Sequence, residues 1–143
     1  MNQDSLSFMS SDLARLLRRA FRQRMSELEM SFEQMRALVT ISRNEGIRQV
    51  ELADLLDVQP ITLVHQLDQL MLGGLIERRP DPSDRRAYQL FLSAAAEPHL
   101  AAIRKIAKAV EQEMLAGLAE TEIAHARNAL RTMRDNLSNR KTS

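Results

Sequence analysis

The sequence predicts a mainly α-helical fold in which a helix-turn-helix is followed by a β-hairpin, the arrangement of a winged helix. Three observations predict it. Only four of the 143 residues are glycine and four proline, and 3% are aromatic, a composition that favours helices. Apolar residues recur at helical spacing along most of the chain. Residues 75–92 are the exception, because two strand-like segments there flank a turn of proline, aspartate and serine.

Length and composition limit the classes of protein to which the chain can belong. The 143 residues, 44% of them hydrophobic, suit one domain with its own core. A formal net charge of +1 excludes a histone-like polycation and an acidic tail. The lack of cysteine excludes thiolate catalysis, thiolate metal sites and thiol redox sensing. No apolar run approaches the roughly 20 residues that span a bilayer, and no signal peptide is apparent, so we expect a cytoplasmic protein without membrane contact.

Residues 11–30 predict one long amphipathic helix, with Ser11 and Asp12 as candidate N-caps. Arginines at i, i+3, i+4 and i+7 give this helix a basic stripe, namely Arg15, Arg18, Arg19 and Arg22. A solvated charged face explains this stripe as well as a binding role does. A second helix is predicted from Ser31, where Gln34 completes a capping box, to about residues 44–46.

Residues 47–74 carry the pattern of a helix-turn-helix. A helix over 49–56 and a link over 57–59 precede a second helix, which begins at Pro60 and ends at Gly73. We expect these apolar side chains to be buried: Val50, Leu52, Ala53, Leu55, Leu56, Ile61, Val64, Leu67, Leu70 and Met71, with Leu63 at the margin. The outward side chains of the second helix are of the kind that read base edges in a major groove: Thr62, His65, Gln66 and Gln69. An ordinary helical hairpin is the alternative.

The helix-turn-helix is too acidic to bind DNA by itself. Between Gly46 and Leu75 its single arginine, Arg48, stands against four carboxylates. Affinity for a duplex comes mostly from neutralising phosphates, so the positive charge has to come from elsewhere.

The following hairpin carries that charge. Strands over 75–79 and 86–92 are predicted around a turn over 80–84, and they place Arg78, Arg79, Arg85 and Arg86 beside the turn. An arginine at a hairpin tip can enter a narrow minor groove, and Asp84 can orient it through a carboxylate–guanidinium pair. A solvated tip is the alternative.

The run from Leu52 to Ser93 resembles the DNA-binding core of the MarR family of transcriptional regulators, and most of all its SlyA branch. Four motifs in the order and spacing of that branch carry the resemblance: SDLAR at 11–15, LDQL at 67–70, GLIERR at 74–79 and SDRRA at 83–87. It extends from about residue 11 to residue 137. The resemblance implies a homodimeric winged-helix protein that binds pseudo-palindromic promoter DNA, and a role as a repressor is expected. In many members small anionic aromatic ligands weaken that binding.

The resemblance also implies an organisation of the chain. Residues 31–96 form the winged helix-turn-helix DNA-binding domain, with a recognition helix at about 60–72 and a wing at about 75–92. Residues 1–30 and 97–143 form a helical dimerisation region.

Carried over by residue, the resemblance places Thr62, His65 and Gln66 in the major groove, Arg86 in the minor groove and Asp84 as its orienting partner. With the residues singled out above, the expected DNA contacts are Thr62, His65, Gln66, Gln69, Asp84, Arg85 and Arg86. The SlyA branch commonly has arginine where this chain has His65, so an altered or weaker sequence preference is expected.

The same resemblance suggests a small-molecule effector. Arg15 and Arg18 match arginines of the ligand crevice in SlyA-like proteins, and Met35 stands where that branch has an aromatic residue. An anionic aromatic effector would pair with the two guanidinium groups but would lack its stacking partner. Salt bridges within the protein are an equally good explanation of both arginines.

Residues 97–138 predict two more helices. The second carries a heptad-like seam of Ile123, Ala126, Leu130, Met133 and Leu137. The two helices could pack on each other as a hairpin. Because a complete winged helix precedes them, we expect the seam to pack between two chains, together with the N-terminal helix, in a homodimer.

The sequence lacks the motifs of an enzyme. It has no glycine-rich phosphate loop, GxSxG, HExxH or paired-carboxylate signature, so neither catalysis nor a cofactor is expected. His65, His99 and His125 lie in separate elements, so no metal site is expected. The sequence predicts a dimeric regulator that binds double-stranded DNA. The competing hypothesis, favoured by the acidic helix-turn-helix, is a winged-helix protein–protein interaction module without specific DNA binding.

Overall fold

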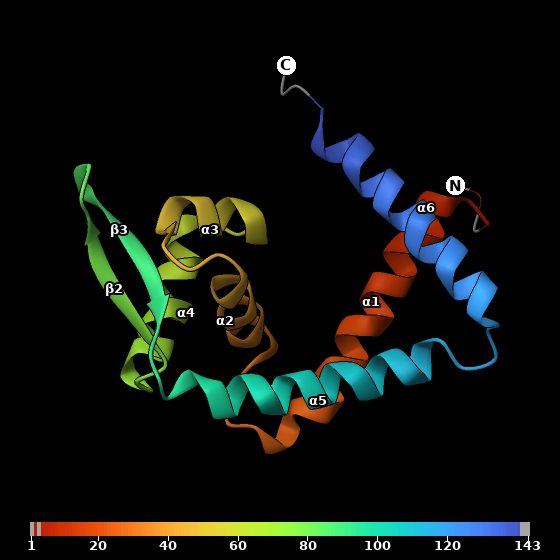
Figure 1. Cartoon of the computed structure of the whole chain (residues 1–143), viewed down its shortest axis with the longest axis horizontal. Helices are drawn as coiled ribbons and strands as arrows, with labels where there is room; N and C mark the ends of the chain where they lie inside the picture. Colours follow the sequence, from red (N-terminus) through yellow and green to blue (C-terminus); the bar gives the residue numbers. More distant parts are fainter. Residues whose placement is uncertain (1, 3, 141–143) are drawn as a thin grey trace. The chain divides into compact units, whose positions relative to one another are not determined.

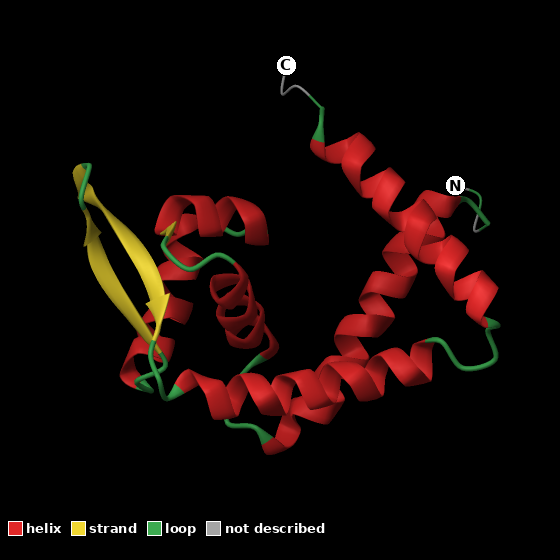
Figure 2. Cartoon of the chain, viewed as in Figure 1, coloured by secondary structure: helices red, strands yellow, loops and turns green. Residues whose placement is uncertain are grey.

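The computed structural model describes residue 2 and residues 4–140 of the chain, and these are mainly helical with one small antiparallel sheet (Figures 1 and 2). The elements follow in the order α1 (Leu6–Arg24), the 3-10 turn η1 (Met25–Glu27), α2 (Phe32–Arg43), β1 (Ile47–Arg48), α3 (Gln49–Leu56), α4 (Pro60–Leu72), β2 (Ile76–Asp81), β3 (Asp84–Leu92), α5 (Ala96–Met114) and α6 (Glu120–Ser138). The chain divides into two compact units, one ending at Val110 and one beginning at Glu111. The predicted winged-helix fold is confirmed.

Local capping decides where the first two helices begin. The predicted capping box of α2 is confirmed, because Ser31 Oγ accepts from the Gln34 backbone N–H at 3.1 Å and Gln34 Oε1 accepts from the Ser31 N–H at 2.9 Å. The predicted start of the first helix is wrong. It begins at Leu6, since Ser5 Oγ caps the Phe8 N–H at 3.2 Å and residues 6–10 contain no helix breaker. It ends at Arg24, where the turn η1 buries Met25.

The helix-turn-helix has the predicted bounds but a narrower buried face than predicted. Its buried side chains are Leu52, Ala53 and Leu56 of α3 and Leu63, Leu67 and Leu70 of α4. The prediction that Val50, Leu55, Ile61 and Val64 are buried is wrong, because their exposed fractions are 68%, 58%, 81% and 37%. A helix turns only one stripe to a core, and these four side chains lie outside that stripe.

Two backbone positions make the turns around α4 possible. Asp57, between α3 and α4, has φ +54, a left-handed conformation that aspartate tolerates better than most residues. Pro60 takes the first helical position as predicted. At the other end Gly73 keeps a right-handed conformation and Gly74, with φ +72, redirects the chain into β2.

The sheet has the strand order β1-β3-β2, with both pairs antiparallel. The hairpin strands are longer than predicted, since β2 reaches Asp81 and β3 begins at Asp84. The sequence analysis did not predict β1, which pairs Arg48 with Gln89. The hairpin contacts α2 and α3 through β3 and α4 through β2 (Figure 1). The wing is therefore anchored on the helix-turn-helix by both sheet and helix contacts.

One core serves the helix-turn-helix and the base of the wing. The largest fully buried side chains come from α2, α3, α4 and β3: Leu38, Ile41, Leu52, Leu63, Leu67 and Leu90. Leu100 and Ile103 of α5 pack into the same cluster. The position of α4 relative to the wing is therefore fixed by packing rather than by a flexible loop.

The second unit has little packing of its own. Helix α6 lies wholly within the described residues and buries none of its side chains, and its Leu130 and Leu137 are 55% and 67% exposed. No helix among residues 2 and 4–140 is long and apolar enough to cross a membrane. Over the same residues, no group of three or more histidine and acidic side chains is placed to hold a metal ion.

Candidate nucleic-acid interface

Helix α4 presents a mixed polar and apolar surface away from the core. Of the predicted contacts, Thr62, His65 and Gln69 are exposed, while Gln66 is half-buried. Sequence reasoning missed Ile61, which is 81% exposed in the first turn of the helix. The spacing of the leucines could have indicated that Ile61 is exposed, because Leu63, Leu67 and Leu70 form a complete core stripe at i, i+4 and i+7 without Ile61.

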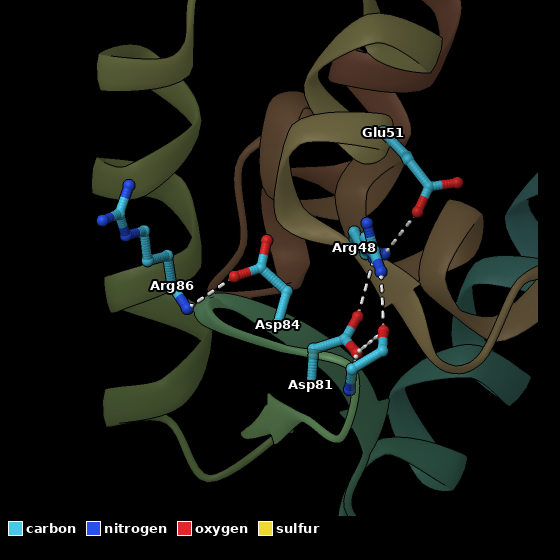
Figure 3. A network of polar contacts seen from close by, with 6 residues as sticks. Arg48, Glu51, Asp81, Asp84 and Arg86 are labelled. Atoms are coloured by element: carbon cyan, nitrogen blue, oxygen red, sulfur yellow. Dashed lines mark hydrogen bonds and ion pairs between the residues drawn. The ribbon is translucent and has the colours of Figure 1, made fainter.

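The turn of the wing leaves two arginines available. Arg85 and Arg86 are exposed, and their guanidinium groups have no ion-pair partner within residues 2 and 4–140. The expected pair between the Asp84 carboxylate and the Arg86 guanidinium is not the contact found. Asp84 Oδ1 instead accepts the Arg86 backbone N–H at 2.9 Å, as Figure 3 shows. Asp84 therefore fixes the backbone at Arg86 and leaves the guanidinium free.

The two arginines at the base of the wing are engaged within the protein. Arg79 pairs with Glu77 at 2.9 Å and lies 4.1 Å from the centre of the Phe91 ring. Arg78 is 5.5 Å from the Tyr88 ring and approaches an Asp68 oxygen on α4 at 3.6 Å. Its Nε and Nη2 are buried and have no hydrogen-bond partner among the described residues. Cation–π contacts and weak ion pairing therefore hold Arg78 and Arg79 on the strands.

A surface groove of about 380 Å³ separates the wing from the starts of α3 and α4. Arg86, Ala87 and Tyr88 of the wing line one side, and Val50 and Pro60 of the helices line the other. The free guanidinium of Arg86 and the first turn of α4 thus border the same surface feature.

A polar cluster ties the turn of the wing to the start of α3 (Figure 3). Arg48 donates from Nε to Asp81 Oδ2 at 2.6 Å and from Nη2 to Ser83 Oγ at 3.1 Å. The other carboxylate oxygen, Asp81 Oδ1, accepts from the backbone N–H and the hydroxyl of Ser83 at 2.8 and 2.7 Å. We call Arg48, Asp81 and Ser83 the wing clamp. In Figure 3 the wing clamp lies on one side of Asp84 and Arg86 lies on the other.

The wing clamp holds Asp81 in its charged form. The hydrogen bonds from Ser83, followed by that from Arg48, lower the pKa of Asp81 below its usual value of 3.8. The Asp81 side chain is only 4% exposed, so its charge is satisfied inside the cluster rather than by water. Sequence reasoning missed these contacts because Arg48 and Asp81 are 33 residues apart.

The residues expected to bind an effector lie in different environments. Arg15 pairs with Asp12 at 2.7 Å, and Arg18 is exposed one turn further along α1. Met35 is 6% exposed and belongs to the core. Arg22, from the same arginine stripe, pairs with Glu33 at 2.9 Å and lowers the pKa of that carboxyl group. At least one arginine of the stripe, Arg22, therefore makes an ion pair within the protein.

Comparison with known proteins gives one consistent result. Residues 30–88 match the family model described as the MarR family. The structure is similar to a crystal structure of MarR, with a TM-score of 0.82, 27% identity and coverage of 94% of this chain and 98% of that chain. It is similar to the transcriptional regulator PA3341 at a TM-score of 0.83 and 31% identity, over 95% and 100% of the two chains. A MarR transcriptional regulator from Methanosarcina mazei Go1, at 23% identity, shares the fold with a TM-score of 0.84 over 92% and 94%.

Proposed function

The chain belongs to the MarR family, and from this premise we propose that it is a dimeric regulator that binds pseudo-palindromic promoter DNA and represses transcription. One observation carries the proposal. The exposed first turn of α4 and the free guanidinium of Arg86 border one groove on a single packed unit. A recognition helix and a wing held in this way can engage adjacent grooves of one duplex.

The chemistry of the two elements suits their proposed grooves. On α4, Thr62, His65 and Gln69 offer hydroxyl, imidazole and amide groups, which read base edges in a major groove. On the wing, Arg86 enters the minor groove and Arg85 meets phosphate. The two free arginines supply the positive charge that α3 and α4 lack.

Exposed apolar stripes support a homodimer. Helix α1, which lies within the described residues and has no buried side chain, exposes Leu6, Met9, Leu13 and Leu16 along one side. On α6, Leu130 and Leu137 are exposed on the predicted seam. Apolar rows of this length are normally covered, and a second copy of the chain is the partner that we propose for each. A dimer would place two copies of α4 about 34 to 36 Å apart, one turn of the duplex.

Release by an anionic aromatic effector at Arg15 and Arg18 is a further part of the proposal. The effector would displace Asp12 from Arg15, exchanging one carboxylate for another. Because Met35 lies in the core, it would not offer the effector a stacking surface. Salicylate is a suitable probe, since it is small, anionic and aromatic. Salicylate should weaken DNA binding of the wild-type protein but not of Arg18→Ala. This result would support the effector site.

A protein–protein interaction module is the second candidate. The exposed side of α3 carries Glu51, Asp54 and Leu55, and Leu55 is 58% exposed. An apolar side chain within an acidic surface suits a basic protein partner better than DNA.

Selection of bound sequences from a random duplex pool tests the first candidate against the second. We expect an inverted repeat with half-sites about 10 base pairs apart. Its affinity should fall steeply with salt and fall strongly in Arg86→Ala, whereas Lys108→Ala, which removes an equal charge from an exposed position on α5, should retain it. Binding at the non-specific level of about 10⁻⁴ to 10⁻⁶ M, with no common sequence, would favour the interaction module.

A further inference from the structure

We propose that Ile61 reads the 5-methyl group of thymine, and so makes a thymine at a fixed position of each half-site a determinant of specificity. The proposal rests on the proposed function, since it requires that α4 enters the major groove. Ile61 is 81% exposed and occupies the second position of α4. The first turn of a recognition helix is the part that approaches base edges most closely.

The fold gives no reason for an isoleucine at this position. The core stripe of α4 is complete without it, and Val58 and Leu63 occupy the two positions at which apolar residues staple the start of this helix. Isoleucine is β-branched and forms helices less readily than alanine, so an exposed isoleucine is slightly unfavourable for α4. The side chain is therefore unexplained by folding.

The chemistry of the major groove identifies what this side chain can recognise. Isoleucine has no hydrogen-bond donor or acceptor. Nearly every group at the base edges of this groove is a donor or an acceptor, and the apolar exception is the methyl group of thymine. Val64 is 37% exposed one turn further along α4 and adds a second apolar side chain beside Ile61. Together they form a small apolar surface that a thymine methyl group can cover.

Polar neighbours confine the proposed contact to one base pair. Thr62 follows Ile61 directly and His65 lies one turn further along α4, and both are exposed and offer hydrogen bonds to adjacent base edges. A hydrogen-bonding base edge placed against Ile61 would lose its water without gaining a partner. The same surface would accept 5-methylcytosine better than cytosine, because the methyl group occupies the same place in the groove.

Replacing thymine by deoxyuridine in the selected duplex tests the proposal with the wild-type protein. This change removes the methyl group and keeps every hydrogen-bonding group. At one symmetry-related pair of thymines we expect affinity to fall about fourfold for each methyl group removed. Ile61→Ala should lose most of this discrimination, because only Val64 and the alanine methyl group remain to contact the thymine methyl group. Leu72→Ala is the matched control, since Leu72 is 83% exposed at the other end of α4, and it should discriminate as the wild type does.

The outcomes separate this inference from the proposed function. Failure to select any duplex would overturn both. Tight, salt-dependent binding with the same affinity for thymine and deoxyuridine at every position would overturn the role of Ile61. The proposed function as a DNA-binding regulator would be unaffected. An Ile61→Ala protein that loses affinity for thymine and deoxyuridine duplexes to the same degree would also overturn methyl recognition. Because Ile61 is exposed and alanine forms helices more readily, the thermal midpoint of Ile61→Ala should be no lower than that of the wild type.

Discussion

Arg48 Nε lies 2.6 Å from Asp81 Oδ2, a contact that joins the start of α3 to the turn of the wing. Ser83 completes the cluster by binding both residues. The wing is a two-stranded projection, and residues 82–86 at its outer end are all exposed. A charged hydrogen bond at this point restrains the segment that carries Arg85 and Arg86. Arg48, the single arginine of the acidic helix-turn-helix, thus helps to position Arg85 and Arg86 of the wing.

Asp81→Asn should weaken DNA binding several-fold while leaving the fold intact. The amide keeps the shape of the carboxylate but loses the charge that Arg48 requires, so the turn of the wing becomes more mobile. Titration of the selected duplex, with hydrogen exchange over residues 81–86, measures both effects. Glu77→Gln is the control, because Glu77 pairs with Arg79 on the exposed side of the hairpin. Faster exchange with unchanged affinity would show that the wing clamp does not serve DNA binding.

The wing clamp should also make stability depend on pH in acid. The pKa of Asp81 is lower in the folded chain than its usual 3.8, so its contribution is complete above about pH 3.8 and is lost as the pH falls through the lowered value. Thermal midpoints of the wild type and Asp81→Asn should differ by a constant amount at neutral pH. The two should converge below about pH 3.8. A constant difference down to pH 2 would contradict the assigned pKa shift.

Arg85→Ala should weaken binding to all duplexes to a similar degree and lower the slope of log affinity against log salt by about 0.9. The reason is that Arg85 has no partner among the described residues and is free to meet phosphate. Arg79→Ala is the control, since its guanidinium is held by Glu77 and Phe91. Equal slopes for the wild type and Arg85→Ala would remove Arg85 from the interface.

The sequence was sufficient for features that depend on neighbours along the chain. The capping box at Ser31, the bounds of α3 and α4 and the place of Pro60 all follow from local chemistry. The MarR family was predicted from motifs and is supported by the comparisons. The SlyA branch and the roles of the DNA-contact residues stay predictions.

Features that depend on tertiary structure could not be predicted from the sequence. The spacing along α4 allowed more than one apolar stripe, and packing against α2 and β2 decides which stripe meets the core. Ile61 was therefore assigned to the core although it is exposed. The contact between Arg48 and Asp81 arises only because β1 pairs with β3. The predicted partner of Asp84 was the Arg86 side chain, whereas the turn brings the backbone N–H closer.

Leu130→Glu should convert the protein to a monomer. Leu130 is 55% exposed on α6, and glutamate forms helices readily, so the substitution leaves the folded chain intact but places a charge in the proposed seam between two copies. Sedimentation over a range of concentrations measures the oligomeric state. Leu55→Glu is a matched control, because Leu55 is 58% exposed on α3, outside the proposed seam, and this variant should remain a dimer.

The monomer should lose more affinity for the inverted repeat than for a single half-site. Two linked half-sites gain affinity because the second contact is intramolecular, and that gain disappears when the copies separate. A Leu130→Glu protein that stays dimeric would place the dimer contact elsewhere, with the exposed leucines of α1 as the next positions to substitute. A monomer that bound the full repeat as tightly as the wild type would instead show that dimerisation is not needed for recognition.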